Sequence, residues 1–312
     1  MTLRIRIAAL LLATGLLAGR VGHAEEEKPE SWVVDEAVPV EKPAADDVKV
    51  LARYDFEEGI QGWKREEWKE YKPWNEVAHE RANAFQGSRG ALKTTSPNTW
   101  NCLGPLVDFK FKEAGTKISF ACYGHNCAAV HVQCWSVDHD KNMHYTCKPY
   151  RDREWRTHTA EIGKLVTWGG TSPSPVGNAF RTVQVFAGCK KGFADTYLLL
   201  DNIVVYNGTD RVPPGMTTGL SGRVDWEAGS VVIGWKAPRD NVGVARFHVY
   251  RSTGSGFTPS VRNMVGSSAD VSFADATVGN FGIFFYRVVA EDYAGNRSRP
   301  SKALAVRVVE KE

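Results

Sequence analysis

Residues 116–150 constrain the fold of this chain more than any other segment. Short β-rich runs in this segment are interrupted by two polar stretches, residues 123–126 and 139–142. This is the pattern of strands joined by tight turns. Four of the six cysteines of the chain also lie here. The segment therefore predicts three consecutive strands that carry most of the cysteines.

The second turn sets an expected register for the last two of these strands. If residues 139–142 form a four-residue loop, Asp138 lies opposite Met143, and counting outward places Cys134 opposite Cys147. A disulfide between directly opposed residues of neighbouring strands is sterically feasible. We therefore predict a disulfide between Cys134 and Cys147 that links the hairpin.

Alternation of side chains divides this hairpin into two faces. One face is apolar and is predicted to join the core: Val130, Val132, Cys134, Tyr145 and Cys147. The other face carries aromatic and polar side chains: His131, Gln133, Trp135, His144, Thr146, Lys148 and Tyr150. Such a face suits a sugar, whose apolar ring side stacks on aromatic rings while its hydroxyls need hydrogen-bond donors and acceptors. We therefore predict that this face, apart from Thr146, binds a glycan.

The preceding strand is expected to contribute to the same core. Ile118, Phe120 and Cys122 point to the core side if an odd-length loop, which contains Cys127, connects this strand to the next.

The first 24 residues have the organisation of a secretory signal peptide. Two arginines precede an apolar run over residues 7–19, and the small residues Gly22 and Ala24 stand where a signal peptidase prefers them. The run is too short to span a bilayer and Arg20 closes it, which makes a membrane anchor the weaker interpretation. We predict that residues 1–24 are removed and that the protein is secreted to the periplasm, the cell surface or the extracellular medium.

Charge and hydropathy argue against a nucleic-acid partner and a membrane span. The chain has 39 basic and 36 acidic residues, and removal of the signal peptide with its three arginines leaves 36 of each. A nucleic-acid-binding protein would show a basic excess or a cluster of Lys and Arg, and neither is present. Since no second long apolar run exists, the sequence predicts neither a nucleic-acid partner nor a membrane span.

The cysteines indicate a disulfide framework in one part of the chain. Their number is even and export permits oxidation, although six cysteines allow 15 connectivities. Besides Cys134 with Cys147, we predict Cys122 with Cys127 and, by exclusion, Cys102 with Cys189. Zinc binding is the alternative, but the sequence contains no CxxC pair.

Composition along the chain predicts two all-β domains. Residues 25–47 are rich in Glu, Pro and Ala and are predicted to form a disordered tether. Residues 48–208 show short alternating strands without a helical period, which indicates a sandwich or barrel. The Val-Pro-Pro-Gly stretch at 212–215 interrupts the pattern, and residues 209–312 contain about seven strand signals, the number in an immunoglobulin-like sandwich.

The second domain resembles bacterial fibronectin type III modules over its whole length. The motifs that carry this resemblance are GWKAP (234–238), DNVGV (240–244), FHVYR (247–251), FAD (273–275) and YRVVAEDYAGNRS (286–298). The resemblance implies a fibronectin type III β-sandwich, with Trp235, Tyr250 and Tyr286 as central residues. It also implies a spacer role beside a carbohydrate-active or carbohydrate-binding domain.

The first domain resembles carbohydrate-binding modules of the jelly-roll, galactose-binding-like class. The matching motifs are YDFEEG (54–59), GW (62–63), FQGSRGAL (85–92) and LLLDNI (198–203). The resemblance implies a jelly-roll β-sandwich and a structural Ca²⁺ held by Glu57 and Asp201, with backbone carbonyls nearby. Calcium takes six to eight oxygen ligands, so two acids that merely serve turns remain an alternative.

These observations predict a secreted, non-catalytic protein that binds a polysaccharide or glycoconjugate. A hydrolase would need two suitably placed carboxylates or a nucleophile with its base. The one dense polar cluster, formed by Asp138, His139, Asp140 and His144, is interpreted as turn chemistry. Two alternatives stay open: a structural or adhesive surface protein that binds another protein, and a small glycoside hydrolase or lyase.

Overall fold

The structure is a computed structural model that describes residues 31–34, 47–65, 76–95, 100–105, 109–110, 115–138, 140–148, 151–167, 179–190, 193 and 195–310. These residues form antiparallel strands and short 3-10 turns, with no α-helix in the described ranges. The predicted all-β class, a jelly-roll sandwich followed by an immunoglobulin-like sandwich, is confirmed.

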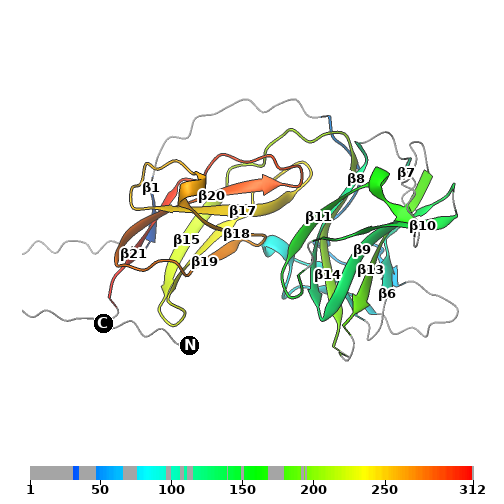
Figure 1. The fold of residues 1–312 in the computed structure, drawn as a ribbon, viewed down its shortest axis with the longest axis horizontal. Coiled ribbons are helices and arrows are strands. Elements are labelled where there is room, and N and C mark those ends of the chain that lie inside the picture. Colours follow the sequence, from blue (N-terminus) through cyan, green and yellow to red (C-terminus); the bar gives the residue numbers. More distant parts are fainter. Residues whose placement is uncertain are drawn as a thin grey trace, which may run out of the picture.

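The first sandwich consists of two facing sheets (Figure 1). Its seven-stranded sheet contains β3 (Lys64–Arg65), β6 (Trp100–Leu103), β7 (Phe109–Lys110), β9 (Cys127–Ser136), β10 (Lys141–Thr146), β12 (Val166–Thr167) and β13 (Ala179–Cys189). Its six-stranded sheet contains β2 (Lys49–Tyr54), β4 (Glu76–Glu80), β5 (Ala91–Thr95), β8 (Lys117–His125), β11 (Arg156–Glu161) and β14 (Tyr197–Asn207).

The second sandwich lies beside the first in Figure 1 and is smaller. Its five-stranded sheet contains β1 (Ser31–Val34), β17 (Val244–Ser252), β18 (Met264–Ser268), β20 (Gly282–Asp292) and β21 (Ala303–Val308). Its three-stranded sheet contains β15 (Thr218–Asp225), β16 (Ser230–Lys236) and β19 (Ser272–Asp275).

Strands β8 and β9 fill the first core from opposite sides. Phe120 on β8 and Val132 on β9 are both fully buried in one apolar cluster, although the two strands belong to different sheets. The tight turn expected between these strands would pair them in one sheet, but the chain instead passes from one sheet to the other at Asn126, which has a left-handed backbone (φ 58°). The expectation that Ile118, Phe120 and Cys122 face the core is confirmed.

Aromatic rings organise the second core. The Trp235 indole packs edge-on against Phe247 with ring centroids 5.2 Å apart, and Tyr286 is fully buried in the same cluster. Tyr250 is also buried but lies outside that cluster. The prediction of a buried Trp235 and Tyr286 at the centre is confirmed.

One stretch of the predicted tether is a strand. Residues Ser31–Val34 form β1, which pairs antiparallel with β21 and extends the five-stranded sheet of the second sandwich. The prediction that residues 25–47 form a disordered tether is wrong for this stretch. A β-rich Ser-Trp-Val-Val run can add to an edge strand that offers unpaired backbone groups.

Side chains from the first sandwich hold backbone groups of the second. Arg53 donates hydrogen bonds to the carbonyl oxygens of Asn241 (2.6 Å) and Val242 (3.3 Å). The amide of Gln86 donates to the carbonyl oxygens of Val244 and Ala269, both at 3.0 Å. These bonds fix the orientation of the two sandwiches relative to each other.

Apolar packing reinforces this junction. Val204 and Tyr206 on β14 form a buried cluster with Val242 of the second sandwich, and Tyr293 packs against it.

Candidate functional site

The β9–β10 hairpin has a register that differs from the predicted one. Met143, not Cys147, lies opposite Cys134, and Gln133 lies opposite His144. The ladder ends at the pair Ser136 and Lys141, and beyond it Val137 and Asp138 hydrogen-bond to the backbone of Ala179 at the start of β13. The predicted partners are thus displaced by four residues.

A displacement by an even number leaves the two faces of the hairpin unchanged. Val130, Val132 and Cys134 are buried in the core, as expected, and Met143 joins them. His131, Gln133 and Trp135 therefore share the opposite face of β9, and His144 and Thr146 lie on the same side of β10. The structure brings together four of the six predicted ligand-binding residues on one sheet face.

The centre of this outer face is an amide pair. Gln133 Nε2 donates a 2.7 Å hydrogen bond to Oε1 of Gln184 on the neighbouring strand β13. Both side chains are buried, although they point away from the core. Gln184 was not among the predicted site residues. A polar residue between Val183 and Val185, which both face the core, was the available sequence signal.

Two imidazoles lie next to the amide pair on the side of β10. His131 Nδ1 lies 3.1 Å from Thr146 Oγ1, and the His131 and His144 rings meet edge-on with centroids 5.7 Å apart. Burial lowers the pKa of His131, and the neighbouring His144 lowers it further. Burial also lowers the pKa of His144, against an opposing effect of a hydrogen bond with the Val166 backbone. Both rings are therefore neutral at pH 7 and offer a donor and an acceptor.

Trp135 lies at the other end of the face. It stands opposite Asn142 on β10 and Arg181 on β13, and its side chain is partly exposed. Lys148 follows β10 and is exposed, whereas Tyr150 lies outside the described residues. The face thus combines one partly exposed indole, buried amides and neutral imidazoles.

The predicted disulfides are not formed in the described part of the chain. Cys122, Cys127, Cys134 and Cys147 form no disulfide and are buried in the first core. The register expected for the Cys134–Cys147 disulfide is wrong, because Cys134 lies opposite Met143. Cys122 and Cys127 lie on the two facing sheets of one core and form no disulfide.

The third predicted disulfide does not fit the ladder. Cys102 lies opposite Val185, while Cys189 lies opposite Cys127 four residues further along β13. The side chains of Cys102 and Cys189 are outside the described part.

The predicted calcium ligands have different surroundings. Asp201 is fully buried, and its carboxylate accepts hydrogen bonds from Ser88 Oγ (2.8 Å) and the backbone of Phe85. Burial raises the pKa of Asp201 to about 8, and these hydrogen bonds oppose that shift. Glu57 instead pairs with Arg89 at 2.9 Å. Asp201 has the burial expected of a ligand while Glu57 is engaged elsewhere, so calcium at this pair stays a prediction.

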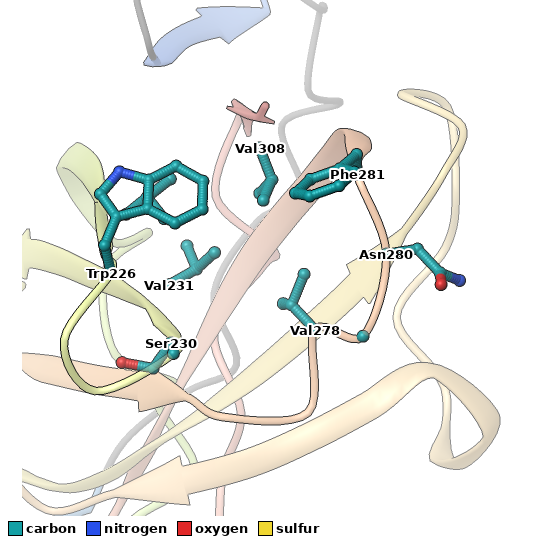
Figure 2. A pocket seen from close by; sticks show the side chains of 10 residues that line it. Trp226, Ser230, Val231, Val278, Asn280, Phe281 and Val308 are labelled. Atoms are coloured by element: carbon teal, nitrogen blue, oxygen red, sulfur yellow. The ribbon is translucent and has the colours of Figure 1, made fainter. Parts of the chain in front are cut away.

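A pocket of about 260 Å³ opens at the end of the second sandwich. Figure 2 shows Trp226 and Phe281 on opposite sides of it, with Val231, Val278 and Val308 between them. Both aromatic side chains are exposed. This pocket is not among the predicted sites, although a tryptophan in the polar turn that follows Asp225 was an available sequence signal.

A second cavity, of about 440 Å³, lies between the two sandwiches. Its walls include Glu57 and Ser88 from the first sandwich and Trp235 and Asp240 from the second. The cavity therefore belongs to the junction and lies away from the outer face of β9 and β10.

No protein family matches this sequence, and no curated protein matches it. No helix among the described residues has the length and apolar character needed to cross a membrane.

Solved structures resemble the chain in part. A glycoside hydrolase domain, Endo-D from Streptococcus pneumoniae R6, is 13% identical over 78% of this chain and 37% of its own length, with a TM-score of 0.37. The family 11 carbohydrate-binding module of a cellulosomal cellulase of Clostridium thermocellum is 15% identical over 53% of this chain and 97% of its own, with a TM-score of 0.36. A Fn3-like protein from Clostridium thermocellum is 23% identical over 32% of this chain and 97% of its own, with a TM-score of 0.27. The chain thus spans about a third of the Endo-D domain and nearly all of the other two.

Proposed function

We propose that this protein is a secreted, non-catalytic glycan-binding protein whose site is the outer face of β9, β10 and β13. The observation that supports this most is the arrangement of Trp135, the Gln133–Gln184 pair and the His131–His144 pair on one side of three adjacent strands. We name these side chains the outer face.

The chemistry of the outer face suits a neutral sugar. A partly exposed indole offers an apolar plane for the ring side of a pyranose. The half-buried imidazoles supply both donors and acceptors, which matches hydroxyl groups that need both, and the buried Gln133–Gln184 pair fixes the sheet beside them. The described side chains of these three strands on this side include no carboxylate, so the face would not repel an acidic sugar through charge.

Catalysis is a weaker candidate for this face. Glycoside hydrolysis requires two carboxyl groups on either side of the scissile bond. Asp138 and Asp140 lie at the end of the hairpin. The Asp138 carboxylate accepts a hydrogen bond from the backbone of Ala179. The proposed activity is therefore binding of the glycan without cleavage of its bonds.

The test is binding of the full chain to a panel of purified polysaccharides, followed by calorimetry with the best ligand. Trp135→Ala should weaken binding by about 1 to 3 kcal/mol, since a stacked, partly desolvated aromatic ring contributes more than an exposed hydrogen bond. Trp226→Ala is the matched control, because this indole lies in the second sandwich.

Three outcomes would count against the proposal. Loss of binding in Trp226→Ala alone would move the site to the pocket of Figure 2. Release of reducing ends from any polysaccharide would favour the hydrolase alternative. Absence of glycan binding, with capture of a defined surface protein through Trp135, would favour the adhesive alternative.

A further inference from the structure

Three aspartates meet where the two sandwiches join. Asp210 belongs to the segment that connects the sandwiches, Asp240 to the loop between β16 and β17, and Asp292 to the end of β20. One carboxylate oxygen of each lies within 4.8 Å of one oxygen of both others. Asp210 and Asp292 are almost fully buried, at 4% and 2% exposure.

Some of the carboxylate oxygens of this cluster already accept hydrogen bonds from protein groups. Asp240 Oδ2 accepts from the backbone of Val242 and Gly243, and Asp210 Oδ1 accepts from the backbone of Val212 and the side chain of Asn241. These bonds hold each carboxylate in a fixed orientation within its loop.

Asp292 is held in the same way. Its Oδ1 accepts from the backbone of Ala294 and Asn296, and its Oδ2 accepts from the Asn296 amide at 2.8 Å. The third carboxylate is thus also preoriented.

The remaining oxygen of two of these carboxylates lacks a partner. Asp210 Oδ2 and Asp240 Oδ1 are inaccessible to solvent and form no hydrogen bond with any described group. A buried carboxylate oxygen without a donor loses its hydration without compensation, which is costly and rare in native proteins. A ligand that supplies positive charge would compensate both atoms at once.

Protein cations do not fill this role in the described part of the chain. The guanidinium of Arg53, which comes from β2, donates to the carbonyl oxygens of Asn241 and Val242. Neither it nor any other described Lys or Arg forms an ion pair with one of the three aspartates. The charge of Arg53 acts on Asp240 from a distance, but the cluster has three carboxylates and no described cation in an ion pair with any of them.

We propose that Asp210, Asp240 and Asp292 bind a divalent cation of the calcium class. Carboxylate oxygens are the ligands that hard cations prefer, and water completes the shell of six to eight oxygens that Ca²⁺ takes. The cation fastens the connecting segment, through Asp210, to two loops of the second sandwich. Since Arg53 holds one of these loops from the first sandwich, cation binding tightens the junction as a whole.

The first test compares melting of the full chain in EDTA and in excess CaCl₂. Calcium at about a hundred times its Kd should raise the melting temperature of the wild-type chain by roughly 5 °C. Asp210→Asn should lose this rise. In EDTA the same variant should melt no lower than the wild type, because it removes one of three facing negative charges while keeping the shape of the side chain.

Asp201→Asn is the control that separates this site from the predicted pair Glu57 and Asp201. It should keep the calcium-induced rise if the cation binds at the junction. If Asp201→Asn loses the rise and Asp210→Asn keeps it, calcium binds only in the first sandwich and the proposal is wrong. Equal melting temperatures of the wild type in EDTA and calcium would also overturn it.

A direct binding measurement covers the case in which Asp210→Asn does not fold. Tb³⁺ luminescence excited through aromatic side chains should saturate with the wild-type chain and decrease when Ca²⁺ is added. Asp292→Asn should reduce the terbium signal at least tenfold at limiting Tb³⁺. An unchanged titration in a folded Asp292→Asn chain would contradict the proposal.

Discussion

Gln133 donates a 2.7 Å hydrogen bond to Gln184 across β9 and β13, and both amides are buried on a face that is directed away from the core. This bond fixes the orientation of both amides beside the imidazoles of His131 on β9 and His144 on β10. A change of either glutamine therefore alters the surroundings of the other one on this face.

The amide pair gives the first prediction. Gln133→Ala should lower the free energy of unfolding by about 1 to 3 kcal/mol, because it leaves the Gln184 amide buried without this partner. The double variant Gln133→Leu with Gln184→Leu should be closer to the wild type in stability, since it removes both hydrogen-bonded amides together and fills their space. Urea unfolding measures both values, and a double variant less stable than Gln133→Ala would contradict the interpretation.

The second prediction concerns the junction between the sandwiches. Gln86 has a left-handed backbone (φ 53°) and its amide holds two carbonyl groups of the second sandwich. Gln86→Gly keeps that backbone without strain and removes the amide, while Gln86→Asn keeps an amide at the same position and is the control for the added flexibility of glycine. We expect a loss of about 1 to 3 kcal/mol and, in calorimetry, separation of one unfolding transition into two. A single transition at the wild-type temperature would show that the amide does not couple the sandwiches.

The third prediction is a pH dependence of stability. Burial, with the nearby charge of Arg156, lowers the pKa of His158 to about 4. An unfolded histidine has a pKa near 6.5, so between these values the unfolded state binds a proton that the folded state does not. Stability is therefore lost as the pH falls from about 6.5 to about 4, by up to about 3 kcal/mol.

His158→Phe is the matching variant, because the ring lies beside Phe120 in the first core. Its urea midpoint should change less between pH 7 and pH 4.5 than that of the wild type. Equal changes in both chains would assign the pH dependence to other groups.

The fourth prediction concerns the thiols. Burial raises the pKa of Cys122 to about 12 and raises the pKa of Cys134 and Cys147 as well. Buried protonated thiols react slowly, so an aromatic disulfide reagent should modify them only after unfolding. At least four thiols should then react in non-reduced protein. If the thiols of the unfolded protein react only after reduction, the disulfides expected from export are present and the prediction is wrong.

The sequence predicted the faces of the hairpin better than its register. Side-chain direction repeats every two residues, so the placement of Trp135 and Gln133 opposite the core survives any even displacement. The β9–β10 ladder ends at Ser136 and Lys141, and the next residues, Val137 and Asp138, instead hydrogen-bond to Ala179 some forty residues later in the chain. Local turn chemistry does not contain that information.

Contacts between distant segments explain most other differences. The pairing of Gln133 with Gln184 and the meeting of Asp210, Asp240 and Asp292 depend on sheet order, which alternation alone does not specify. The same is true of β1, a short strand in a segment whose composition is typical of a disordered tether.

The pairing of β1 with β21 has a mechanical consequence. Ser31 lies opposite Val306 and Val34 lies opposite Ala303, so the chain enters β1 and leaves β21 at the same end of the ladder. A pulling force applied across Ser31 and Val306 therefore loads the interstrand hydrogen bonds one after another, as in a zipper, and does not shear them together. When such a protein is held at both ends of its chain, β1 peels away at low force while the two sandwiches stay folded behind it.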